Sequence, residues 1–369
     1  MTWTMLDKSA KIYVAGHRGL VGSAIWRSLQ GRGYNNLVGR SHGELDLCDS
    51  ITVKAFFDEQ MPDAVVLAAA HVGGIWANLN YPADFIAENL QIQQNVIMEA
   101  FRHGVSRLLF LGSTCIYPRM APQPIAEDAL LTSPLEYTNE PYAIAKIAGL
   151  KLCESLSRQY GVNYLAVMPT NLYGPGDNFH LANSHVLPAM IRKIHLAKCL
   201  GLGDMDSVRR DLAARPVDGV DGSAGADEIS AALSRYGIYP GRVLLWGSGR
   251  PLREFLWSED MADASVHVLL NVDFASCASQ CPMGPDGVRE VRNCHINIGT
   301  GKELHISELA SLVASAVGFG GDIGWDASKP DGTPRKLCDV SKIHSLGWRH
   351  SVELPEGIDR LHKWYINNL

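Results

Sequence analysis

A glycine-rich turn directly after an apolar run is the feature that most constrains how this chain can fold. Residues 11–15 (KIYVA) predict a buried strand, and Gly16, Gly19 and Gly22 follow it at G-x-x-G-x-x-G spacing. A helix is expected over 19–29, and its N-terminal amides, with glycine backbone that a ligand can approach closely, favour a bound pyrophosphate. Glycine spacing alone is a weak signal, because a glycine-rich turn can also occur without a ligand. The strand–turn–helix context nevertheless favours dinucleotide binding.

The first half of the chain alternates short apolar runs with longer amphipathic stretches. This alternation predicts an α/β fold with a doubly wound, Rossmann-type parallel sheet and helices on both faces. The expected strands are 11–15, 37–40, 64–70, 107–112 and 164–169, and the expected helices are 19–29, 83–103 and 139–160. We expect them to form a nucleotide-binding domain over 1–176, with contributions from about 255–300.

The second half predicts a smaller, mixed α/β substrate domain over 177–369. The helices expected in the second half are 185–198, 260–270, 307–317 and 354–368, and the expected strands are 242–246 and 295–299. Of these, 260–270 and 295–299 fall in the part expected to contribute to the nucleotide-binding domain. Residues 201–241 are interpreted as an insert. This insert is either a surface subdomain with short helices near 205–214 and 226–236 or a partly mobile loop. A second insert, 271–292, is expected to be loop-like.

Composition excludes several classes of protein. Of 369 residues, 46% are hydrophobic and 20% charged, which is typical of a globular protein rather than a disordered chain or a coiled coil. The net charge of −6 argues against nucleic acid as the main partner. The chain has no apolar run of about 18 residues, so no membrane partner is expected. The N-terminal residues lack the apolar core of a secretory signal, so a cytoplasmic location is expected.

The eight cysteines are expected to be reduced in that compartment. One group, Cys277, Cys281, Cys294 and His295, has the residue types of a zinc site. Its C-x3-C spacing is loose for zinc, and the segment is interrupted by glycine and proline. A solvated loop with free thiols is therefore favoured, and no metal is expected.

Basic residues near the glycine turn indicate which dinucleotide would bind. A site for NAD usually places a carboxylate at the end of the second strand, but this chain has Arg40 there and Arg18 in the turn. Basic residues suit the 2′-phosphate of NADP, although a lone arginine can also be a solvated surface residue. Asp46 follows, and it either accepts a hydrogen bond from the adenine amine or simply begins a helix.

Three residues predict hydride-transfer chemistry. Tyr142 and Lys146 lie at i and i+4 of the expected helix 139–160, hence on one face. A nearby cation is expected to lower the pKa of the phenol, so that Tyr142 passes a proton near neutral pH. Ser113 follows the strand 107–112, and ligands bind at the carboxyl ends of such strands. Ser113 is therefore expected to hydrogen-bond the substrate oxygen that Tyr142 protonates.

These motifs resemble those of the extended short-chain dehydrogenase/reductases and, more narrowly, the GDP-L-fucose synthase family. The resemblance covers nearly the whole chain outside the two inserts. Its segments are 15–24, 67–86, 108–118 (LLFLGSTCIYP), 138–155 (TNEPYAIAKIAGLKLCES), 168–189, 246–255 (WGSGRPLREF) and 326–336 (DASKPDGTPRK). Several of these segments are long and unusual, so the match is more specific than the glycine turn.

The resemblance implies a two-stage reaction on GDP-4-keto-6-deoxy-D-mannose. Carbons 3 and 5 are inverted, and the ketone at carbon 4 is then reduced with NADPH. Ser113, Tyr142 and Lys146 match the reductase triad of the family, and Cys115 and His185 match its epimerisation acid/base pair. The family also implies a homodimer built from paired helices.

The resemblance further implies two sets of binding residues. The cofactor set is Gly16, Arg18, Gly19, Leu20, Val21, Gly22, Arg40, Asp46, Leu47, Ala69, Leu111, Lys146, Pro169, Asn171, Leu172 and His185. The substrate set is Asn171, Lys193, Trp246, Arg253, Asp331 and Lys336. Two positions depart from the family pattern: His42 stands near a position that is often basic, and Lys193 stands where arginine occurs in other members.

The chemistry of the residues supports the resemblance. Carbons 3 and 5 lie α to the ketone, so their protons can be removed if the enolate oxygen is stabilised. A thiolate is a competent base, and histidine can return a proton near neutral pH. Taken alone, Cys115 is better explained as a small core residue and His185 as a structural histidine, and it is the resemblance that favours the catalytic roles. A nucleotide-sugar 4-epimerase, a dehydratase and a non-catalytic NADP-binding sensor are the alternatives.

Overall fold

The structure is a computed structural model that describes residues 6–329 and 331–369. It forms two compact units. Unit 1 comprises the chain up to Leu172, Ser258–Gly301 and Leu337–Ser351, and unit 2 comprises Tyr173–Trp257, Lys302–Lys336 and Val352–Leu369. Residues 337–351, which the sequence analysis assigns to the second domain, thus lie in unit 1.

Unit 1 has a parallel sheet with strand order β11-β5-β4-β3-β1-β2 in the described part of the chain. The strands are β1 (Ile12–Ala15), β2 (Leu37–Val38), β3 (Ala64–Leu67), β4 (Arg107–Leu111), β5 (Asn163–Pro169) and β11 (Ile296–Ile298). β6 (Asn171–Tyr173) follows β5 and crosses into unit 2. The central strands are apolar and buried because both faces of the sheet are covered, which confirms the predicted α/β fold.

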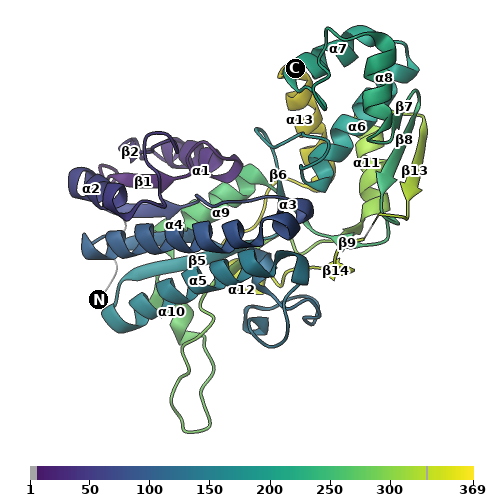
Figure 1. The fold of residues 1–369 in the computed structure, drawn as a ribbon. Coiled ribbons are helices and arrows are strands. Elements are labelled where there is room, and N and C mark those ends of the chain that lie inside the picture. The colour runs from purple at the N-terminus through teal and green to yellow at the C-terminus, as the bar shows by residue number, and fades with distance from the viewer. Residues whose placement is uncertain (1–5, 330) are drawn as a thin grey trace. The chain divides into compact units, whose positions relative to one another are not determined.

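Two layers of helices cover this sheet. α4 packs against α5, and α1 packs against α9 (Figure 1). The helices are α1 (Leu20–Gly31), α2 (Ser50–Gln60), α3 (Ile75–Asn80), α4 (Pro82–Arg102), α5 (Glu140–Tyr160), α9 (Ser258–Asn271), α10 (Phe274–Ser279) and α12 (Ser341–Ser345). Short 3-10 turns lie at η1 (Thr114–Ile116), η2 (Glu127–Ala129) and η3 (Tyr137–Asn139). Val96 and Ile97 of α4 join Ile147 and Leu150 of α5 in one buried core.

The strand register places the expected functional loops at one edge of the sheet. Ala15 pairs with Leu67, and Leu67 pairs with Phe110 of the next strand. Leu111 pairs with Val167 in turn. Because the strands are parallel, the turns after β1, β3, β4 and β5 all leave the sheet at its carboxyl edge, where α/β proteins bind ligands.

Unit 2 is the smaller, mixed α/β unit. Its helices are α6 (Val186–Gly201), α7 (Met205–Ala214), α8 (Ala226–Ser234), α11 (Ile306–Val317) and α13 (Leu354–Asn367). Its strands are β7 (Ile238–Tyr239), β8 (Arg242–Trp246), β9 (Leu252–Arg253), β10 (Phe255–Trp257), β12 (Leu304–His305), β13 (Asp322–Asp326) and β14 (Arg335–Lys336). Among the described residues, one sheet has the order β13-β8-β7 and another β12-β9-β14.

The insert at 201–241 is a packed subdomain rather than a mobile loop. α7 and α8 lie where the two short helices were expected. Each helix carries one apolar face: Val208 and Leu212 of α7 and Ile229 and Leu233 of α8 are buried in the core of unit 2. Within the described ranges, no helix is both long and apolar enough to cross a membrane.

Candidate active site

The turn between β1 and α1 needs glycine for two separate reasons. Gly16 has a φ of +81°, and a Cβ there would lie 2.8 Å from the backbone nitrogen of Ala69. A Cβ on Gly22 would lie 2.1 Å from the carbonyl oxygen of Gly16. The turn therefore packs tightly against the segment after β3, and Gly16 and Ala69, both expected to bind the cofactor, lie side by side.

The N-terminus of α1 is suited to a phosphate. Gly19 caps the helix with extended backbone and provides no side-chain hydrogen bond, and Leu20 and Val21 open the first turn. The first amides of a helix have no partner within the helix, and they favour an anion. The glycine cradle together with these amides fits the pyrophosphate of a dinucleotide.

Two arginines lie next to this turn. The His17 ring packs against Gly39, where a Cβ would lie 2.5 Å from its Cγ, and contacts Trp26 at 5.5 Å between ring centroids. Partial burial and the charges of Arg18 and Arg40 lower the pKa of His17, against a smaller opposite effect of Glu44. Both arginines are thus close to one ring at the turn, as a 2′-phosphate site requires.

The residues after the second strand have mainly local partners. Asp46 accepts a hydrogen bond from the backbone nitrogen of Cys48 at 2.9 Å, whereas Asp49 caps α2 by accepting from Ile51. Asp46 therefore shapes the turn before α2 and does not itself begin the helix, and its hydrogen bond to the adenine amine stays a prediction. Leu47 is held by the Asn95 side chain, which donates to its carbonyl at 2.9 Å.

The residues of the expected triad lie just after β4 and on α5, and α5 packs against η1. Ser113 follows β4 and accepts a hydrogen bond from the backbone nitrogen of Cys115 at 3.2 Å. Tyr142 is in the first turn of α5, and its ring contacts Phe85. Lys146 is one turn further on, and its Nζ donates to the Leu111 carbonyl at 3.0 Å.

The expected lowering of the Tyr142 pKa is wrong for this structure. Burial raises the pKa of Tyr142, and the Cys115 charge raises it further. Lys146 is not among the causes of this shift; its ammonium bonds the Leu111 carbonyl and lies 5.8 Å from the centre of the Tyr142 ring. Burial also lowers the pKa of Lys146 to about 8. Tyr142 is therefore a neutral phenol at pH 7, the form that donates a proton.

The sequence analysis missed one residue at this site, Asn139. Its Nδ2 donates a hydrogen bond to the sulfur of Cys115 at 3.3 Å. Asn139 ends η3 and immediately precedes α5, three residues before Tyr142. Its place in the TNEPYAIAK segment is the signal that could have revealed it.

The remaining expected cofactor residues of unit 1 lie near the end of β5. Pro169 is its last residue, and Thr170 continues along β11 through a hydrogen bond to the Ile298 carbonyl at 3.0 Å. Asn171 and Leu172 begin β6. These residues leave the sheet at the same edge as Ser113.

The other expected residues belong to unit 2. His185 directly precedes α6, and partial desolvation lowers the pKa of its ring, so that it is neutral at pH 7. Lys193 lies on the same helix and is only 5% exposed. Burial lowers its pKa to about 8. Its ammonium lies 5.4 Å from the centre of the Trp246 ring, and Lys329 lies 5.5 Å from that ring.

Two segments of unit 2 hold the other expected substrate residues. Asp331 accepts hydrogen bonds from Ser248, from its nitrogen at 2.8 Å and its hydroxyl at 2.6 Å, and these bonds lower the pKa of Asp331. Burial lowers the pKa of Arg253, while the Asp331 charge opposes that effect. Lys336 on β14 pairs in register with Arg253 on β9. Unit 2 thus gathers several cations around Trp246 and the 248–253 turn.

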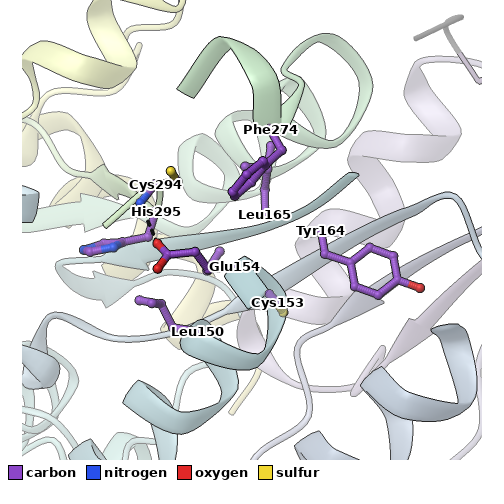
Figure 2. A pocket seen from close by; sticks show the side chains of 9 residues that line it. Leu150, Cys153, Glu154, Tyr164, Leu165, Phe274, Cys294 and His295 are labelled. Atoms are coloured by element: carbon purple, nitrogen blue, oxygen red, sulfur yellow. Dashed lines mark hydrogen bonds between the residues drawn. The ribbon is translucent and has the colours of Figure 1, made fainter. Parts of the chain in front are cut away.

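A small cavity in unit 1 is unrelated to these residues. It encloses about 10 Å³ between α5, β5, α10 and the segment before β11, which is room for about one water molecule. Figure 2 shows Glu154, Cys294 and His295 beside it, and Glu154 accepts from the Cys294 nitrogen at 3.0 Å. The expected site residues do not line this cavity.

The cysteine group near this cavity differs from expectation in one respect. Cys277, Cys281 and Cys294 are buried rather than solvated, because α10 (Phe274–Ser279) forms inside the segment expected to be a loop. Cys281 and Cys294 approach with 3.6 Å between sulfurs, and the cysteines form no disulfide. The described residues include no cluster of three or more groups able to hold a metal.

Comparison with known proteins identifies the family of this chain. Residues 12–214 and 225–279 match the NAD dependent epimerase/dehydratase family. The chain belongs to this family. A GDP-L-fucose synthase of Arabidopsis thaliana is 50% identical over 99% of this chain and 96% of its own length. The GDP-L-fucose synthase of Escherichia coli K12 is 47% identical over 97% of each chain, so the resemblance found in the sequence is confirmed.

Solved structures of family members have the same fold. A GDP-6-OMe-4-keto-L-xylo-heptose reductase from C. jejuni matches with a TM-score of 0.90 and 41% identity, over 99% of this chain and 100% of that one. MlghC, a GDP-mannoheptose C4 reductase from Campylobacter jejuni with NADP bound, matches with a TM-score of 0.85 and 40% identity, over 98% and 99%.

Proposed function

We propose that this enzyme converts GDP-4-keto-6-deoxy-D-mannose to GDP-L-fucose by inverting carbons 3 and 5 and then reducing carbon 4 with NADPH. One observation carries the proposal: Tyr142, which can donate a proton, and the Cys115 thiol, which accepts a hydrogen bond, both lie near the carboxyl edge of the sheet in unit 1. Tyr142 and Lys146 suit ketone reduction, whereas Cys115, held by Asn139, suits proton removal. The full-length identity to GDP-L-fucose synthases supports the substrate.

The residues of unit 1 fit NADP. The glycine turn leaves room for pyrophosphate, the first amides of α1 face no side-chain cap, and Arg18 and Arg40 supply cations for a 2′-phosphate. Ala69, Leu111, Pro169 and Leu172 would contact the rest of the cofactor along the same sheet edge, and Asn171 lies there as well. When bound, NADPH supplies the hydride for carbon 4.

In the epimerisation stage, the protein removes and returns protons beside the ketone. Cys115 takes the proton from the carbon through its sulfur, and His185 returns a proton on the opposite face. Ser113 Oγ and the Tyr142 hydroxyl donate hydrogen bonds to the oxygen of the enolate, which lowers the cost of its charge. Because desolvation lowers the pKa of His185, it is the protonated minority of this ring that returns the proton at pH 7.

In the reduction stage, Tyr142 donates its proton to the oxygen of carbon 4 as the carbon–hydrogen bond forms. The raised pKa of Tyr142 keeps that proton on the phenol until charge develops on the substrate oxygen. Lys146 remains mainly charged at pH 7 and balances the resulting phenolate. Lys193, Trp246, Arg253, Asp331 and Lys336 of unit 2 are proposed to hold the GDP-sugar, with the cations on its diphosphate.

The test is to supply GDP-4-keto-6-deoxy-D-mannose and NADPH and to identify the product by NMR. We expect GDP-L-fucose, with both carbon centres inverted. A product that keeps the original configuration at carbons 3 and 5 would reject the epimerase stage.

A second candidate is reduction of a GDP-4-keto-heptose without inversion. It is favoured by the two heptose reductases of C. jejuni, which are 40–41% identical to this chain. Faster reduction of such a heptose than of the 6-deoxy sugar would favour this alternative.

Assembly and location are also proposals. A homodimer through α5 is supported by Ile144 and Tyr160, apolar side chains that are exposed on this helix.

A cytoplasmic location is supported by the eight cysteines, none of which is in a disulfide.

A further inference from the structure

The sulfur of Cys115 is held by a side chain that the reaction described above does not require. Asn139 Nδ2 donates to Cys115 Sγ at 3.3 Å. The backbone nitrogen of Cys115 donates to Ser113 Oγ at 3.2 Å. Cys115 is thus fixed on both sides, through its backbone by Ser113 after β4 and through its sulfur by Asn139 before α5.

The partners of the Asn139 amide differ from those of other buried amides in this unit. Its Oδ1 is buried and accepts no hydrogen bond from the described residues. Asn89, which supports the fold, contrasts with it: Asn89 Nδ2 donates to the His71 and Phe85 carbonyls, and Asn89 Oδ1 accepts from the His71 nitrogen. Asn78 and Gln93 also have a buried oxygen without a partner among the described residues, but their nitrogens donate to backbone carbonyls. Asn139 differs because its nitrogen donates to a sulfur.

An N–H donor favours the charged form of its acceptor. Hydrogen bonds to an ionised acceptor are shorter and stronger than those to a neutral one, so an amide aimed at sulfur stabilises a thiolate more than a thiol. Tyr142, from the same helix, also interacts electrostatically with Cys115, but it is neutral at pH 7. The Asn139 amide, by contrast, donates directly to the sulfur.

We propose that Asn139 is a positioning residue for epimerisation, which holds the Cys115 sulfur in place and favours its thiolate form. This inference rests on the proposed function, in which Cys115 removes the proton. It predicts that loss of the amide affects proton removal and leaves hydride transfer nearly unchanged.

The first test measures thiol reactivity without substrate. Cys48 and Cys115 are half-buried and the other cysteines are buried, so Cys48 is an internal reference. The protein is treated with iodoacetamide at pH 7, and alkylation of each cysteine is followed by peptide mass spectrometry. Asn139→Asp keeps the shape but replaces the donor with a carboxylate, and it should lower the Cys115 rate relative to Cys48 by about tenfold or more. Asn139→Gln keeps the amide and should restore part of the rate. An unchanged ratio in Asn139→Asp would overturn the proposal.

The second test separates the two stages. Asn139→Asp and Asn139→Ala should slow deuterium exchange at carbons 3 and 5 of GDP-4-keto-6-deoxy-D-mannose about tenfold or more. Reduction of the already inverted keto sugar should stay within about twofold. Asn271→Asp, which removes an amide donor to the His267 carbonyl at the end of α9, is the matched control. Equal loss of both stages would mean a structural role and reject the proposal. If the wild type shows no exchange, the proposed function fails, but the alkylation ratio still decides whether Asn139 polarises the sulfur.

Discussion

Two neighbouring cations on α6, Arg192 and Lys193, lie in opposite environments. Arg192 is completely buried and fully paired: its guanidinium contacts Asp211 of α7 at 2.7 Å and donates to the Phe179 carbonyl. Asp211 also accepts a hydrogen bond from Tyr365. Lys193 is nearly as buried, yet it forms no salt bridge within the described ranges and faces the Trp246 ring.

The difference separates groups that maintain the fold from groups that serve a ligand. A buried charge is costly unless it is paired, so the insert at 201–241 contributes Asp211 to neutralise Arg192. The burial of Lys193 without a carboxylate is a cost that an anionic ligand would remove. Asn139 in unit 1 shows the same pattern, with one end of its amide bonded to Cys115 and the other without a partner among the described residues.

The largest effect is expected on stability, when the buried pair of Arg192 and Asp211 is broken. Arg192→Met leaves Asp211 buried without its cation, so the free energy of unfolding should fall by about 3–5 kcal/mol, measured by guanidinium denaturation. The KM for the GDP-sugar should change little in the folded fraction. Arg210→Met, which removes an exposed cation that donates to the Ser207 hydroxyl and is not paired with Asp211, is the control. A loss no larger than in the control would contradict the structural role of Arg192.

Loss of the unpaired cation, Lys193, should instead weaken substrate binding and leave stability unharmed. Lys193→Met should raise the KM for the GDP-sugar about 10- to 100-fold. This range corresponds to the loss of about 1.5–3 kcal/mol, which is typical of a hydrogen bond to a charged group. The unfolding free energy of this variant should stay the same or increase, because an unpaired buried charge is removed. Lys198→Met on the same helix, where Nζ donates to the Val317 carbonyl, is the matched control. A large loss of stability with an unchanged KM would show that Lys193 maintains the fold.

The titration of Lys193 gives a further test, because its charge should have opposite effects on substrate affinity and on stability. Burial lowers the pKa of Lys193 to about 8, so its charge is present at pH 7 and is lost above pH 8. Affinity for the GDP-sugar, measured by calorimetry, should fall about fivefold between pH 8 and pH 9. Stability has the opposite sign: the unfolded state holds more protons between pH 8 and about 10.5, so the folded state gains stability as pH rises through that window. Lys193→Arg should remove the fall in affinity, and its persistence would assign it to another group.

The smallest effect concerns the cofactor. Arg40 lies near the glycine turn and forms no salt bridge in the part of the chain that the structure describes, whereas Arg27 pairs with Glu259 at 2.5 Å. Arg40→Ser should weaken NADPH binding up to about tenfold and leave NADH binding unchanged, because NADH lacks the 2′-phosphate. Arg27→Ser should affect neither, as fluorescence titration can establish. Equal weakening of both cofactors would remove Arg40 from the 2′-phosphate site.

The fold could be predicted where the apolar pattern was strong. The buried strands and the long helices α4 and α5 follow directly from apolar periodicity. α2 was missed because its apolar face is weak, with Ile51 exposed and Phe56 and Phe57 buried side by side. α10 was missed because it is only six residues long and lies in a segment broken by glycine and proline.

The site could be predicted as a set of residues but not as an electrostatic environment. Helical spacing placed Tyr142 and Lys146 on one face, as observed. The pKa of Tyr142 could not be predicted because it depends on burial and on the Leu111 carbonyl that binds Lys146, and neither is visible in the sequence. The contact between Asn139 and Cys115 joins residues 24 positions apart and depends on how η1 meets α5.

The most direct test of the two-stage account measures deuterium at carbons 3 and 5 of the product formed in D2O. The wild type should incorporate deuterium at both carbons. Cys115→Ser should lose this incorporation while still binding NADPH, and Tyr142→Phe should lose reduction far more than cofactor binding. If Cys115→Ser exchanged these protons at the wild-type rate, Cys115 would not be the base and the account would be contradicted.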